Sequence, residues 1–336
     1  MKYVLSKLAL VTAIAVASTA QAEDFEVSDK TTVSLFGAIE LKYNTADEIS
    51  DTDGATESTS GYEDNGSSIG FGAQHDFDNG MSGYIEIEFE HDANESGGEV
   101  LTDKAFAGLI GNFGEVRAGR FDSIYTNALY DLIDPFETVS LGEESVMEED
   151  NQIAYYSPDF SGFTFELQAR VRGDRETDSE GNETGMAGVV KYTADRWAVH
   201  AGVDDRGAEE VRDPITGEWT TEDPVYGLGG VMSLTDQLDL GARVSVQENL
   251  EGSADGDDTT FYGTSLIYDY GPGSAYGAVQ QVDPDQGDSR TEFAAGINYG
   301  VVENLTVYTE YGSYDAADDA VGDIDTQFEV GAIYEF

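Results

Sequence analysis

The stretch YIEIEFE, at residues 84–90, decides the fold of this chain, because apolar and acidic residues alternate strictly along it. Ile85, Ile87 and Phe89 share one face of an extended strand, and glutamates occupy the other face. A strand of this kind needs an apolar environment on one side and water on the other.

The same alternation recurs in about sixteen segments, each near the roughly 9–11 residues that a tilted strand needs to cross a bilayer. Examples are FTFELQARVRG at 163–173, RWAVHAGVDD at 196–205, LDLGARVSV at 238–246 and QFEVGAIYEF at 327–336. Tight turns such as DNG at 78–80 alternate with long polar stretches. Lipid offers backbone groups no hydrogen bonds, so strands can span it only as a closed barrel.

The sequence therefore predicts an all-β fold, a transmembrane antiparallel up-and-down β-barrel of about 16 strands. We expect short periplasmic turns at one end and long extracellular loops at the other. Aromatic residues at strand ends are candidates for the two interfacial girdles: Tyr43, Tyr155, Tyr156, Tyr268, Tyr299, Tyr334 and Phe336.

Residues 1–22 have the pattern of a secretory signal peptide, with Lys2 and Lys7 before a short apolar run and a small-residue cleavage site. The apolar run is too short for a membrane helix. We expect residues 23–336 to form one barrel domain that is exported to the cell outer membrane of a Gram-negative bacterium.

Charge excludes one class of partner. The chain has 68 acidic residues against 16 Lys and Arg, a net charge of −52, and no cysteine. Phosphates would be repelled, so nucleic acid is not an expected partner. Such acidity also keeps a protein soluble and self-repelling in salt, which is typical of halophilic acidic proteins.

Four local features together resemble the general, non-specific porins of Gram-negative bacteria. They are the first strand TTVSLFGAIELKY directly after the signal peptide, the stretch KAFAGLIGNFGEVRAGRFDS at 104–123, the long insertion after it, and the C-terminal aromatic Phe336. The resemblance implies a homotrimer that passes ions and small hydrophilic solutes by diffusion. It also implies lipid and lipopolysaccharide contacts, and recognition of Phe336 by the outer-membrane assembly machinery.

The resemblance further implies that the third loop, at about 122–149, folds into the barrel and narrows it. Its acids are the candidates for the acidic side of a pore constriction: Asp131, Asp134, Glu137, Glu143 and Glu144. Arg120 matches a basic-wall position of the family and Arg117 is a weaker match on the same strand, while Arg170 and Arg172 alternate with apolar residues. Because Arg117 and Arg120 differ by three positions, strict alternation places them on opposite faces, and a β-bulge at Gly119 is a way for both to point inward.

The predicted basic wall is thin, because the first, second and sixth strands carry FGAIE, GSSIG and NQIAY where the family often has further bases. This asymmetry predicts a weakly cation-selective diffusion channel. Two alternatives stay open from the sequence: a substrate-specific outer-membrane channel, and a non-conducting structural or adhesive barrel.

No enzymatic chemistry is indicated. His75, His91 and His200 have no metal-ligand spacing, and no GxSxG motif occurs. We expect no cofactor. The stretches DTDGATES at 51–58 and SADGDDT at 253–259 resemble calcium loops in composition but lack their spacing, so they predict at most adventitious Ca²⁺ or Mg²⁺.

Overall fold

The computed structural model describes residues 23–49, 56–142, 144, 146–147, 149–171, 185–206, 210–212, 219–221, 224–248, 258–285, 287–314 and 324–336. The predicted signal peptide lies outside these residues, as do Glu143 and Arg172. Within the described residues, no helix is long and apolar enough to cross a membrane.

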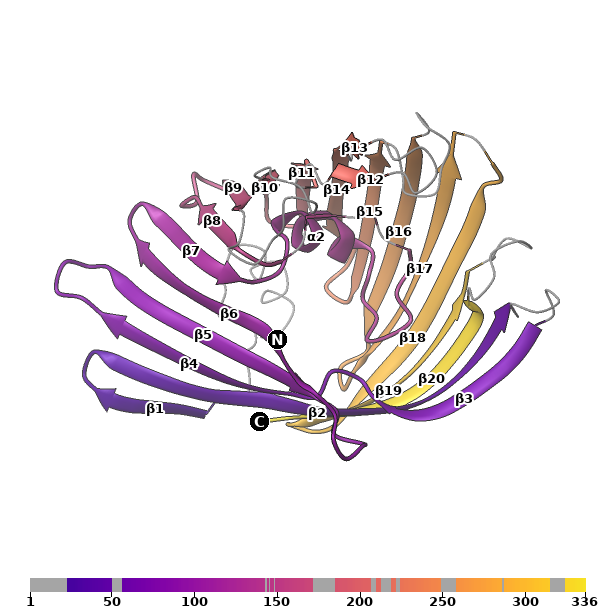
Figure 1. Cartoon of the computed structure of the whole chain (residues 1–336), viewed down its shortest axis with the longest axis horizontal. Coiled ribbons are helices and arrows are strands. Elements are labelled where there is room, and N and C mark those ends of the chain that lie inside the picture. Colours follow the sequence, from indigo (N-terminus) through magenta and orange to yellow (C-terminus); the bar gives the residue numbers. More distant parts are fainter. Residues whose placement is uncertain are drawn as a thin grey trace.

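Antiparallel strands run around a central space in which one short helix lies (Figure 1). The strands of this ring are β2 (Thr31–Ile49), β4 (Ser68–Asp76), β5 (Ser82–His91), β6 (Val100–Gly111), β7 (Gly114–Arg120), β8 (Gln152–Tyr156), β9 (Phe163–Arg170), β10 (Gly185–Thr193), β11 (Trp197–Asp204), β14 (Val225–Ser233), β15 (Leu238–Gln247), β16 (Thr259–Asp269), β17 (Ser274–Pro284), β18 (Arg290–Val302), β19 (Leu305–Ser313) and β20 (Ile324–Glu335). Each pairs with the next, and β20 pairs with β2 to close the ring. The predicted barrel of sixteen strands is confirmed.

Four further strands extend or decorate this ring. β1 (Glu23–Ser28) pairs with the start of β2, and β3 (Thr56–Asp64) pairs with its end. β12 (Glu210–Arg212) and β13 (Trp219–Thr221) form a separate two-stranded sheet. Short turns join the ring strands at one end, and the long connections lie at the other.

The alternation in the sequence becomes a difference between the two faces of the wall. In β5, Ile85 is 50% exposed on the outside, whereas Glu86 is 9% exposed on the inside. Tyr43, Tyr268 and Tyr299 are about half exposed on the outer surface, as expected of girdle residues. Tyr156 is an exception, because it packs inside the barrel beside Phe121.

The closing seam between the first and last ring strands is held at the C-terminus. The backbone N–H of Phe336 donates to Gly37 O at 3.0 Å, and the N–H of Gly37 donates to Phe336 O at 3.1 Å. Gly37 is required at this seam, because a Cβ there would lie 2.5 Å from the carbonyl oxygen of Ser68.

Candidate channel constriction

The long segment between β7 and β8 folds into the ring and lies along its inner wall (Figure 1). It begins with α2 (Ile124–Leu129), followed by the 3-10 helix η1 (Tyr130–Leu132). Ser123 caps α2, since its Oγ accepts a hydrogen bond from the backbone N–H of Tyr125 at 3.1 Å. The segment occupies the range, at about 122–149, where the resemblance implies an inward-folded third loop, and we call it the inner loop.

The first half of the inner loop is held by close apolar packing. The buried face of α2 packs against small apolar side chains of β10 and β14. Glycines on the wall make this approach possible. A Cβ at Gly227 would lie 2.5 Å from Leu129 Cδ1, and a Cβ at Gly241 would lie 1.9 Å from the carbonyl oxygen of Leu132. These glycines therefore form the bed on which α2 and η1 lie.

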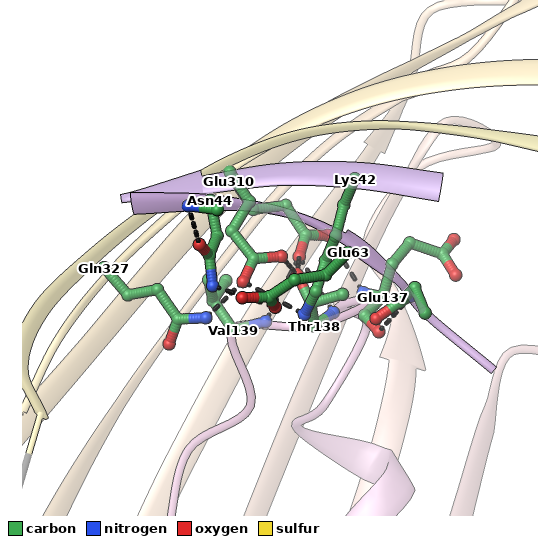
Figure 2. Close-up of polar contacts among 11 residues, drawn as sticks. Lys42, Asn44, Glu63, Glu137, Thr138, Val139, Glu310 and Gln327 are labelled. Carbon is green, nitrogen blue, oxygen red and sulfur yellow. Dashed lines mark hydrogen bonds and ion pairs between the residues drawn. The ribbon is translucent and has the colours of Figure 1, made fainter. Parts of the chain in front are cut away.

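The second half of the inner loop is held by a wall carboxylate. Glu310 of β19 accepts hydrogen bonds from three consecutive backbone N–H groups, at 2.9, 3.1 and 3.3 Å (Figure 2). These groups belong to Glu137, Thr138 and Val139. Glu310 also accepts the Tyr276 hydroxyl at 2.7 Å. The charge of Glu310 is thereby used to fix the loop backbone.

Carboxylates of the two flanking strands hold the loop in the same way. Glu329 of β20 accepts a hydrogen bond from the hydroxyl of Thr138. Glu292 of β18 accepts the Gly142 N–H at 2.7 Å. Glu292 and Glu329, like Glu310, are almost completely buried. Three neighbouring strands thus present glutamates to one side of the inner loop.

A buried ion pair fixes the loop further along. Arg243 of β15 donates from Nη1 to Glu144 Oε2 at 2.6 Å, and from Nη2 to Gln280 Oε1 at 2.8 Å. Its guanidinium also lies over the ring of Tyr130, 4.9 Å from the centroid. Glu144, a predicted constriction acid, is therefore neutralised by a base of the wall and is buried.

The structure separates Arg117 from Arg120. Pairing of β7 with β6 and β8 is continuous, so no bulge forms at Gly119. Gly119 instead has a φ of 143°, and a Cβ there would lie 2.1 Å from the carbonyl oxygen of Ala105. The register shift of this region lies in the β5–β6 pair. The bulge that Gly119 could permit is absent, and the glycine instead allows a positive φ and the close approach of two strands.

Arg117 lies inside the barrel but is 7% exposed. Its Nη2 lies 2.9 Å from Glu115 Oε1, and its guanidinium stacks on Phe106 at 4.5 Å and on Tyr156 at 5.1 Å. Tyr84 shares the same carboxylate. These contacts make Arg117 part of a packed cluster on the inner side of the wall.

Arg120 is half exposed and pairs with the residues that end the inner loop. Its Nη2 lies 3.1 Å from Glu149 and its Nη1 lies 2.9 Å from Asp150. Arg170 is half-buried at the end of β9, where it is opposite Gln152 and Gly185. Because Gly119 of β7 is opposite Gln152 and Gln152 is opposite Arg170, Arg120 and Arg170 lie in the same region of the wall, whereas Arg117 is enclosed in its own cluster.

The predicted acids of the inner loop also differ in their surroundings. Asp131 is exposed on η1, and Asp134 is half-buried and accepts the Phe136 N–H at 3.3 Å.

Glu137 is exposed, although its backbone N–H is hydrogen-bonded to Glu310. Enclosure in the barrel and the carboxylates of Glu310 and Glu335 raise the pKa of Glu137 to about 7. Glu40 of β2 adds a further like charge beside it.

Other bases of the wall also form ion pairs with acids of neighbouring residues. Lys42 lies 3.3 Å from Glu329, and Lys191 lies 2.7 Å from Glu166. Lys104 lies 3.6 Å from Asp122. The sequence did not single out Lys104 or the three loop-binding glutamates. The sequence shows only that each of them is a charged residue on the inward face of an alternating strand, which does not identify its partner.

The described residues contain no group of three or more His, Asp or Glu side chains that could hold a metal ion. The two stretches with calcium-loop composition, at 51–58 and 253–259, lie largely outside the described residues.

Sequence comparison links the whole chain to known channels. The profile of Gram-negative porins matches residues 9–319. A monosaccharide porin of Halomonas sp. and the major outer membrane protein of Halomonas elongata are each 30% identical to the chain, over 94% of its length and 96% of theirs. A chitoporin of Vibrio furnissii is 26% identical over 96% of the chain and 97% of its own length.

Solved structures share the fold at low sequence identity. An anion-selective porin from Comamonas acidovorans superposes with a TM-score of 0.75 at 19% identity, covering 91% of this chain and all of that one. The Salmonella typhi OmpF complex with daunomycin gives a TM-score of 0.71 at 19% identity, covering 94% of this chain and all of OmpF.

Proposed function

The chain belongs to the Gram-negative porin family, and we propose that its channel is a general diffusion pathway that favours cations. The chain is an outer-membrane channel protein and not an enzyme. The solutes of the proposed pathway are ions and small hydrophilic molecules.

The pairing of the wall's bases carries this proposal. Lys42, Lys104, Lys191 and Arg243 each lie within 4 Å of a carboxylate. A paired base contributes little net field to the water beside it, because its partner cancels most of the charge. The described part of the barrel therefore has few unpaired positive charges that could set up an electric field across the channel.

Unpaired acid remains where the inner loop meets the wall. Glu137 is exposed, and Glu335 is a second exposed carboxylate of this region. The Debye length at physiological salt is about 8 Å, so charges on the wall of a narrow channel act on passing ions. Cations should accumulate beside Glu137 and anions should be repelled.

The test is the reversal potential of purified protein in planar bilayers under a KCl gradient, compared between the wild type and Glu137→Gln. We expect the substitution to lower the ratio of K⁺ to Cl⁻ permeability by about twofold to threefold, a change of under 1 kcal/mol. Asp131→Asn is the matched control, because it removes one exposed acid from the same loop at a different place. If both substitutions lowered the permeability ratio equally, Glu137 would not be the acid that sets the cation preference.

A sugar pathway is the second candidate. One relative is named a monosaccharide porin and another a chitoporin. The inner loop carries Phe136 in an edge-on contact with Tyr276, 5.5 Å between ring centroids, beside acidic acceptors. An aromatic ring can stack on the apolar C–H face of a sugar, and carboxylates can accept hydrogen bonds from its hydroxyl groups. A saturable block of ion current by monosaccharides would favour this reading, and a current that sugars leave unchanged would reject it.

We also propose a homotrimer in contact with outer-membrane lipid and lipopolysaccharide. Family membership and the apolar outer surface support it, and Phe336 is the proposed contact for the assembly machinery. Light scattering of the detergent complex, corrected for bound detergent, tests the number of chains. A monomer at micromolar concentration would contradict the trimer.

A further inference from the structure

Strand β1 is an addition to a ring that closes without it. The C-terminal segment covers the edge of β2 as far as Gly37, through β20 and then through the two hydrogen bonds between Gly37 and Phe336. β1 takes over the same edge below this point, with Glu23 opposite Leu35 and Phe25 opposite Val33. The described residues provide no partner for the other edge of β1.

This free edge lies at the end of the barrel with the short turns. β1 and β2 are joined at Asp29–Lys30, and Lys30 forms an ion pair with Asp78 in the short turn between β4 and β5. The Glu335 N–H bonds to Asn304 O in the turn before β19, so the neighbouring wall has already ended at this level. Unpaired backbone groups cannot lie in lipid, so the edge of β1 faces the periplasm.

Both faces of β1 are available beside its free edge. Phe25 is 54% and Val27 is 67% exposed, and Asp24 and Glu26 are exposed as well, with a register shift of the pairing between Glu26 and Ser28. An exposed edge strand is a template for a further strand, in which main-chain hydrogen bonds supply affinity and alternating side chains supply specificity.

We propose that β1 is a docking edge for an extended periplasmic peptide in which basic and apolar residues alternate. Basic residues would lie beside Asp24 and Glu26, and apolar residues beside Phe25 and Val27. A second copy of this chain is a poor occupant, because pairing two β1 edges would place acidic strands side by side, and like charges that face each other destabilise a sheet.

The experiment uses the mature full chain in lipid nanodiscs and a fluorescein-labelled Lys-Val-Lys-Val-Lys-Val peptide, with binding followed by fluorescence polarisation. Two comparisons separate edge pairing from attraction to an acidic protein. One is a variant that lacks residues 23–28, and the other is the same peptide with alternate backbone amides methylated. We expect saturable binding to the full chain, and at least about tenfold weaker binding in both comparisons.

The deletion has its own control. Because the ring closes through β2 and β20, the variant should keep the single-channel conductance of the full chain. Non-saturable binding to the full chain would overturn the proposal, as would equal affinity for the methylated peptide or for the deletion variant. If the deletion instead lowers the number of chains in the complex, the edge pairs copies of this chain and the proposed occupant is wrong.

Discussion

The two halves of the inner loop are held to the barrel wall by different kinds of contact. The half with α2 lies on glycines of β14 and β15, where shape and apolar burial fix it. The half with Thr138 is held by glutamates of β18, β19 and β20. The apolar contact of α2 does not depend on charge. The contact around Thr138 uses glutamates as hydrogen-bond acceptors, and these carboxylates would otherwise face the channel. The comparison shows that the number of acids on the wall overstates the acidity that a passing ion meets.

The largest expected effect is steric, at the α2 end. Gly241→Ala would place a Cβ 1.9 Å from the backbone oxygen of Leu132, so η1 would have to move. Overpacking of this kind costs about 1–3 kcal/mol, and we expect the upper part of this range. Denaturant unfolding in detergent, followed by tryptophan fluorescence, measures the loss. The control is Gly72→Ala, whose Cβ would find its nearest neighbour at 3.5 Å. Equal losses of unfolding free energy in both variants would mean that the inner loop does not need a glycine at position 241.

The second largest effect is expected when the half of the inner loop around Thr138 loses its contact with Glu310. Glu310→Ala removes the acceptor of three loop N–H groups. Water in the lumen can replace part of these bonds, so we expect a loss of about 2 kcal/mol. Single-channel recordings should show added current fluctuations, because the loop backbone near Thr138 is no longer fixed. Quiet, wild-type currents would show that Glu292 and Glu329 hold the loop without Glu310.

A third effect depends on pH. The pKa of Glu137 is raised to about 7, so its carboxyl is charged above this pH and becomes neutral below it. Cation preference should therefore be complete in mildly alkaline solution and decline as the pH falls through 7. Reversal potentials recorded over this range measure it, and Glu137→Gln should flatten the decline. A decline that persists in Glu137→Gln would assign it to another carboxyl group.

The smallest effect is expected at Arg120, which is half exposed in its pairs with Glu149 and Asp150. Exposed ion pairs contribute roughly 0–1 kcal/mol, so Arg120→Gln should change the free energy of unfolding by less than about 1 kcal/mol. Freeing two acids should raise the cation preference slightly. A large loss of stability would mean that Arg120 holds the end of the inner loop in place.

The sequence was sufficient for the barrel, because strand alternation is local and each face of YIEIEFE has one environment. The inner loop was located by the resemblance to porins together with the length of the segment at about 122–149. The sequence did not reveal which acids stay free, because the deciding partners are distant: Glu310 binds Glu137 across 173 positions, and Arg243 binds Glu144 across 99. The role of inward glycines such as Gly241 could not be predicted, because a residue without a side chain adds nothing to the alternation of apolar and polar residues.

We propose that the free charge of the constriction is negative because the bases of the wall are already paired. The most direct measurement is the sign of the zero-current potential of the wild-type channel under a KCl gradient at a pH above 7. The dilute side should become positive, because K⁺ crosses more readily than Cl⁻. A negative dilute side would show that Cl⁻ crosses more readily, and would contradict this proposal.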